Sequence, residues 1–233
     1  MSERSHDLSD TDIRNLGAEL FEANSRLDRA IKALAPKHKG GEWEEYQEAS
    51  QIVLSLERKL AASQGEEYAQ PFGFPLKWDA GAPMPHLLMN DHRAFLCFLL
   101  NERDPSWDGS YVTVKSLDGN QPESLGLVEF KLCLSAKLGS PNDEVFQGHP
   151  LRGKGMEAYG AQHVVNSRWL AELEKINSSH SLYNPASWKE PKHFIFWFHD
   201  STFECIAESY VVETHCISMK EMLTMMVERL IAN

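Results

Sequence analysis

The sequence has few cysteines and no long apolar run. Its four cysteines, Cys97, Cys133, Cys205 and Cys216, include no CxxC pair. We therefore predict buried free thiols in a reducing compartment. No apolar run approaches the roughly 20 residues that span a bilayer, so no membrane segment is expected.

Positive charge is also scarce. The chain has 23 Lys and Arg against 34 Asp and Glu, a formal net charge of -11. Proteins that bind nucleic acid need a basic surface to neutralise phosphates, so we exclude nucleic acid as the main partner. The first twelve residues, MSERSHDLSDTD, lack the apolar core of a signal peptide, and a cytoplasmic location is expected. A hydrophobic content of 42% is ordinary for a globular protein of this length.

Apolar residues recur at helical spacing near the start of the chain. The stripe of Ile13, Leu16 and Leu20 predicts a helix from Ser9 to about Ala35. Pro36 and the glycine-ended run after it end this helix. A second amphipathic helix is predicted from about Glu42 to Ser63, so the two form an antiparallel helical hairpin. The hairpin either packs on its own domain or serves as an arm for oligomerisation.

The densest aromatic stretch runs from Lys192 to Glu208 and reads KHFIFWFHDSTFECIAE. It predicts a β-hairpin that turns at Asp200-Ser201, with His199 facing Thr202. Side chains alternate along a strand, so one face is predicted to be apolar and buried: Phe194, Phe196, Phe198, Phe203, Cys205 and Ala207. The other face is mixed, and it holds His193, Ile195, Trp197, His199, Thr202, Glu204, Ile206 and Glu208.

The rest of the chain predicts an α+β fold, with a mostly antiparallel sheet flanked by helices. Further strands are expected at Ala94–Leu100, Tyr111–Leu117, Leu125–Leu138 and Tyr159–Val165. Further helices are expected to begin near Ser167 and Ser218, which are good N-cap residues. We predict a helical appendage at residues 1–65 and an α+β domain at residues 66–233.

A candidate site combines the loop at residues 141–150 with the turn at residues 198–205. A histidine beside a carboxylate can act as an acid–base pair near neutral pH. We assign His149, His199, Asp200 and Glu204 to catalysis. Asp143, Glu144, Arg152 and Trp197 are assigned to binding. Two histidines with carboxylates can also hold a divalent metal, but no metal-ligand spacing supports one, and no metal ligand or cofactor is assigned.

Structural explanations compete with each of these assignments. His149 can be a turn residue whose ring bonds to backbone, and Asp200 can cap a turn. Ser201 lacks the surroundings of a nucleophile elbow, and Cys205 falls on the predicted buried face. The glycine-rich run around Lys154 matches no phosphate-binding loop.

Three stretches carry a resemblance. They read PNDEVFQGHPL at residues 141–151, YGAQHVVNSRWL at residues 159–170 and KHFIFWFHDSTFECIAE at residues 192–208. Residues 71–212 resemble an uncharacterised family of bacterial proteins. The resemblance implies a soluble bacterial protein, but it carries no established activity. It supports treating the 142–149 loop and the 199–204 turn as one unit.

Two functions are therefore expected from different classes. The first is a soluble binding or assembly protein that forms homo-oligomers through its helical hairpin. The second is a hydrolase that acts on a small molecule, with His199 as base, Glu204 or Asp200 orienting it, and His149 contributing from the loop.

Overall fold

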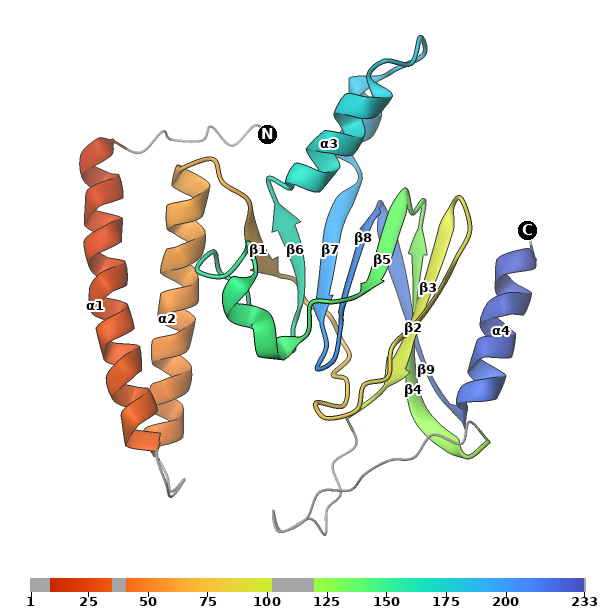
Figure 1. The fold of residues 1–233 in the computed structure, drawn as a ribbon, viewed down its shortest axis with the longest axis horizontal. Coiled ribbons are helices and arrows are strands. Elements are labelled where there is room, and N and C mark those ends of the chain that lie inside the picture. The colour runs from red at the N-terminus through yellow and green to blue at the C-terminus, as the bar shows by residue number, and fades with distance from the viewer. Residues whose placement is uncertain (1–8, 35–40, 102–119, 233) are drawn as a thin grey trace. The chain divides into compact units, whose positions relative to one another are not determined.

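The structure is a computed structural model that describes residues 9–34, 41–101 and 120–232 (Figure 1). The chain divides into two compact units. The first comprises residues 1–70, 148–157 and 164–168, and the second comprises residues 71–147, 158–163 and 169–233. The predicted strand at Tyr111–Leu117 lies outside the described residues.

The first unit is built on the predicted helical hairpin. Its helices are α1 (Asp10–Leu34) and α2 (Gly41–Ser63), which lie side by side in Figure 1. Their shared core is a small apolar cluster: Leu16, Leu20, Ala23, Leu27, Ile52, Val53 and Leu56. The helical spacing of these residues accounts for the packing, because residues three and four apart lie on one helix face.

Two charged residues of α2 bind other parts of the first unit. The Arg58 guanidinium donates to the carbonyl oxygens of Ala69 and Gly155 and forms a 2.7 Å ion pair with Glu157. The buried Glu57 accepts a hydrogen bond from the Gly155 N–H at 3.0 Å. These bonds attach α2 to the 148–157 segment and to strand β1 (Tyr68–Pro71).

The second unit contains two antiparallel sheets, and together with the helices they make the predicted α+β fold. One has the strand order β2-β3-β4-β9: His86–Met89, Arg93–Leu99, Pro122–Lys131 and Ser209–Ser218. The other includes β6-β7-β8-β5: Ala161–Val165, Lys192–Trp197, Thr202–Ala207 and Ser135–Gly139. The last two residues of β6 belong to the first unit.

An aromatic core lies between the two sheets. The predicted buried face of the β7–β8 hairpin is confirmed, since Phe194, Phe196 and Phe203 are fully or almost fully buried. These rings pack against Phe98 and Phe130 from the other sheet. Alternation along the strands placed these phenylalanines on one face, which two facing sheets then bury.

Helix α4 (Met219–Ile231) covers the other face of the β2-β3-β4-β9 sheet (Figure 1). Ser218 caps it as predicted, and Glu221 completes a capping box. Helix α3 (Arg168–Asn177) begins directly after Ser167. The structure also has two short 3-10 helices, η1 (Asp143–Gly148) and η2 (Pro185–Lys189). None of the described helices is long and apolar enough to cross a membrane.

The structure corrects the predicted register of the central hairpin. The turn is formed by His199 and Asp200, one residue earlier than predicted, because the Phe198 N–H bonds to the Ser201 carbonyl oxygen at 2.9 Å. Trp197 therefore faces Thr202. A shift of two in the pairing leaves every side chain on its predicted face, since the strand period is two.

Two further predictions were wrong in detail. The stretch from Leu125 to Leu138 is not one strand, because β4 ends at Lys131 and β5 begins in the other sheet. The chain changes sheets at Leu132, whose φ of 49° is left-handed. Cys216 is exposed, whereas the other three cysteines are buried free thiols as predicted.

Candidate functional site

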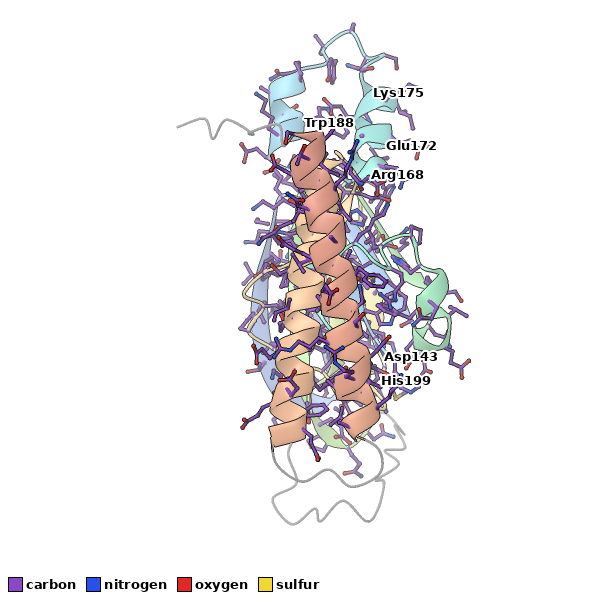
Figure 2. All side chains as sticks on the ribbon, turned by 90° about the vertical axis from the view of Figure 1, so that its left-hand side faces the viewer. Asp143, Arg168, Glu172, Lys175, Trp188 and His199 are labelled. Atoms are coloured by element: carbon purple, nitrogen blue, oxygen red, sulfur yellow. The ribbon has the colours of Figure 1, made fainter. Side chains whose placement is uncertain are left out.

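The structure brings part of the 141–150 loop to the β7–β8 turn. The Asp143 N–H donates to the His199 carbonyl oxygen at 3.0 Å, and the Thr202 hydroxyl donates to the Pro141 carbonyl oxygen at 2.8 Å. Figure 2 shows Asp143 and His199 beside each other. These two hydrogen bonds fix the start of η1 against the turn, so Asp143, His199 and Asp200 form one cluster.

Carboxylates surround the imidazole of His199. Its Nδ1 lies 2.9 Å from Asp200 Oδ1, and its Nε2 lies 3.9 Å from Asp143 Oδ2. The bond with Asp200, helped by the charges of Asp143 and Glu144, raises the pKa of His199 above 6.5. The Tyr159 hydroxyl donates to Asp143, and this bond raises the pKa of the phenol to about 12.

The bond with Asp200 keeps the His199 imidazole protonated to a higher pH than an ordinary histidine, because it raises the pKa. A phenol with a pKa of about 12 is a weak proton donor near neutral pH. The His199 side chain is 40% exposed, so water screens its ion pairs. The hydrogen bonds of this cluster hold the η1 loop against the β7–β8 turn.

Glu204 has different partners from those predicted. It accepts from His193 Nε2 at 2.9 Å and forms a 2.8 Å ion pair with Lys137 of the neighbouring strand. Burial alone would raise its pKa, but the bonds from His193 and Lys137 outweigh burial and hold the pKa below 4.5. The Trp169 ring packs edge-on against His193, and the Lys137 ammonium lies 4.7 Å from the Trp169 ring centre.

The His193–Glu204 pair is packed rather than open. Its side chains are only 5% and 12% exposed, respectively. Trp197 on the same sheet face is fully buried and packs against Phe146 at 5.1 Å between ring centres. This group of side chains therefore presents little surface to a ligand from solvent.

His149 and Arg152 belong to the first unit. The His149 Nδ1 accepts from the Leu151 N–H at 3.2 Å, as expected for a turn histidine. Arg152 lies 3.6 Å from Glu57 Oε1, and Lys154 forms a 2.7 Å ion pair with Glu66. The predicted meeting of His149 with His199 stays a prediction, since the two residues lie in different units.

The geometry gives little support to a cysteine nucleophile, a metal site or a phosphate site. Cys205 is fully buried, and burial raises the pKa of its thiol well above 9.0, so it is not a nucleophile. Within the described residues, no group of three or more His, Cys, Asp or Glu side chains is placed to hold a metal ion. The amide of Gly155 and the ammonium of Lys154 already bind carboxylates, which leaves the glycine-rich run no clear phosphate site.

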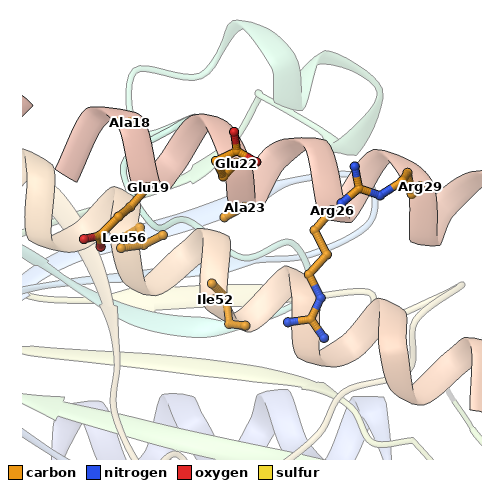
Figure 3. Close-up of a pocket in the computed structure, with 8 residues that line it drawn as sticks. All are labelled: Ala18, Glu19, Glu22, Ala23, Arg26, Arg29, Ile52 and Leu56. Carbon is orange, nitrogen blue, oxygen red and sulfur yellow. The ribbon is translucent and has the colours of Figure 1, made fainter. Parts of the chain in front are cut away.

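A pocket of about 650 Å³ lies on the helical hairpin, where sequence reasoning placed no site (Figure 3). Its apolar lining consists of Ala18, Ala23, Ile52 and Leu56. Its charged lining comes from α1 alone and consists of Glu19, Glu22, Arg26 and Arg29. Figure 3 shows the two glutamates toward one end of the pocket and the two arginines toward the other.

Several interacting residues were missed in the sequence. His193 was placed on the correct sheet face but was not paired with Glu204, because the predicted turn was one residue too late. Nothing in the sequence marked Tyr159 or Lys137 as a member of these groups, since a single tyrosine or lysine near or within a strand is ordinary. The α1 charges had a usable signal, because four charged residues at helical spacing lie on one face.

Comparison with protein-family models, with curated proteins and with solved structures finds no match to this chain. The function is therefore proposed from the geometry of the described residues.

Proposed function

We propose that this chain is a non-catalytic binding or assembly protein that associates with itself through the hairpin of α1 and α2. The pocket on that hairpin is the observation that carries the proposal. It combines an apolar floor with charges of both signs, as protein interfaces do.

The small buried area of α1 supports this proposal. Of its 25 residues, only Ala23 and Ala30 are buried. Phe21 is 71% exposed and Ile31 is 48% exposed. Isolated helices are marginal in water, and most helical stability in proteins comes from packing an amphipathic face. A second hairpin packed on the pocket side of α1 would cover Ala18 there, whereas Phe21 and Ile31, at about 100° per residue, lie on another side of the helix.

The bonding of the other candidate groups to one another also supports the proposed self-association. The cluster around His199 and the pair of His193 with Glu204 are bonded internally. Such groups contribute to folding, and they need no ligand to satisfy them. The hairpin pocket is different, because Ala18 and Ile52 line it and keep apolar surface exposed to solvent.

The test is the mass of the full chain in solution with the pocket blocked. We expect Ala18→Trp to fill the pocket and to move the chain from dimer to monomer in light scattering after gel filtration. Ala62→Trp is the matched control, since Ala62 is exposed on α2 and does not line the pocket, and it should leave the dimer intact. An Ala18→Trp chain that stays as dimeric as its control would overturn the proposal.

The full chain is preferable to a truncated one. Removing residues 1–65 would delete Glu57 and Arg58, which bind the 148–157 segment. A change in the mass of the truncated chain in solution could therefore come from lost self-association or from lost folding.

The hydrolase alternative has one supporting observation, the contact of His199 with Asp143 and Asp200. The bond with Asp200 raises the pKa of His199. The alternative is tested by comparing ester and phosphoester hydrolysis by the unmodified chain and by His199→Ala. Turnover that His199→Ala abolishes would favour the enzyme over the assembly protein.

A further inference from the structure

We propose that two copies of this chain pair α1 against α1 in antiparallel orientation, with Glu19 of each copy facing Arg29 of the other. This inference rests on the proposed self-association and adds its geometry. The occupant of the pocket surface is then a second copy of the same chain.

The spacing of the charges is the first observation. Glu19, Glu22, Arg26 and Arg29 follow one another at intervals of three, four and three residues, and all four line the pocket. At about 100° per residue, these intervals keep the four side chains within roughly 80° of the helix circumference. They therefore form one stripe along a single face of α1.

The order of the charges makes the stripe complementary to itself. A two-fold axis perpendicular to α1 at the level of residue 24 would place Glu19 opposite Arg29 and Glu22 opposite Arg26. At about 1.5 Å per residue, the members of each pair lie at equal heights above and below that level. Every facing pair is then of opposite charge, and two-fold symmetry supplies each pair twice.

A parallel arrangement does not fit these charges. Two copies of α1 in the same direction and in register would set Glu19 against Glu19 and Arg29 against Arg29. Like charges that face each other weaken an interface and select against that arrangement. The charge order therefore favours the antiparallel pairing over the parallel one.

The outer charges are available for such pairing. Glu19 and Arg29 are exposed, and neither lies within ion-pair distance of another residue in the described part of the chain. The charge of Arg29 does contribute to the lowered pKa of Glu45 on α2. Arg26 is held differently, because it binds Glu45 at 2.7 Å and Glu48 at 3.1 Å on α2. These bonds fix Arg26 at the edge of the pocket, so the cleanest test uses Glu19 and Arg29.

The test is a charge exchange followed by sedimentation. Glu19→Arg alone would set two arginines opposite each other in both symmetric pairs, and Arg29→Glu alone would set two glutamates opposite each other there. Each variant alone should dimerise about tenfold or more weakly than the unmodified chain. An equimolar mixture of the two variants should regain dimers.

In the antiparallel mixed dimer the arginine introduced at position 19 faces the glutamate introduced at position 29, and the native Arg29 faces the native Glu19, so every facing pair is again opposite in charge and the mixture should regain the unmodified affinity.

Two further variants sharpen the test. A chain with both Glu19→Arg and Arg29→Glu should dimerise like the unmodified chain, because the exchanged stripe is still complementary to itself. Asp28→Arg is the matched control, since Asp28 is an exposed α1 residue outside the pocket lining, and it should change the affinity less than threefold. The loss in the single variants should shrink between low salt and about 0.5 M salt.

The outcomes separate this inference from the proposed function. Single variants that weaken the dimer, with no recovery in the mixture or in the double variant, would overturn the antiparallel register and leave self-association intact. Single variants that match the unmodified dimer would also overturn it. An unmodified chain that stays monomeric would remove both proposals and leave the pocket to a different partner.

Discussion

Gly155 lies so close to the Arg58 side chain that an added methyl group should destabilise the first unit. A Cβ at this position would lie 2.2 Å from Arg58 Cγ and 2.6 Å from its Nε, and the φ of Gly155 is 77°. Gly155→Ala thus imposes a left-handed backbone on alanine and displaces Arg58. Displacement weakens the bonds of Arg58 to Ala69, Gly155 and Glu157.

The magnitude follows from two contributions. A left-handed conformation costs a non-glycine residue about 1 kcal/mol. Loss of a hydrogen bond to a charged group costs about 1.5–3 kcal/mol. Gly155→Ala should therefore lower the free energy of unfolding by about 2.5–4 kcal/mol, as measured by urea denaturation followed by circular dichroism.

Two neighbouring glycines separate the contributions. Gly153 has a φ of 78°, and no atom lies within 4 Å of an added Cβ, so Gly153→Ala should cost only the backbone share of about 1 kcal/mol. Gly148 has neither strain nor a close neighbour, and Gly148→Ala should stay within about 0.5 kcal/mol. Equal losses for Gly155→Ala and Gly153→Ala would refute the predicted conflict with Arg58.

Three further predictions concern titratable groups. Folding lowers the pKa of Glu204, so its ionised carboxylate stabilises the fold above about pH 4.5, and this stabilisation is lost as pH falls through the folded pKa. Glu204→Gln should therefore reduce the difference between the urea unfolding midpoints at pH 7 and pH 4. NMR titration of His199 should give a midpoint above 6.5 that falls in Asp200→Asn, and an unchanged midpoint would contradict their bond. Ultraviolet titration should place Tyr159 near 12, and Asp143→Asn should bring it back toward 10.

The elements that could be predicted from the sequence were those with a strong local period. The stripe of α1, the N-cap at Ser218 and the phenylalanine face of the β7–β8 hairpin all follow from residues within one segment. The hairpin face tolerated an error in the turn, because a pairing shift of two preserves strand parity. This is why Phe194 and Phe203 were correctly placed in the core.

Features that depend on distant contacts were not predictable in this way. The alternating pattern from Leu125 to Leu138 runs through a change of sheets, so periodicity alone gave one strand where there are two. Glu57 binds an amide 98 residues away, and its burial on α2 has no local cause. The partner of Glu204 depended on a single-residue choice of turn, which Asp200-Ser201 did not specify strongly.

The most direct test of self-association through the hairpin is sedimentation equilibrium of the unmodified full chain over a wide range of concentrations. The chain mass is 26.5 kDa. We predict a reversible rise to twice that mass with increasing concentration. A constant mass of one chain at every concentration would contradict the account.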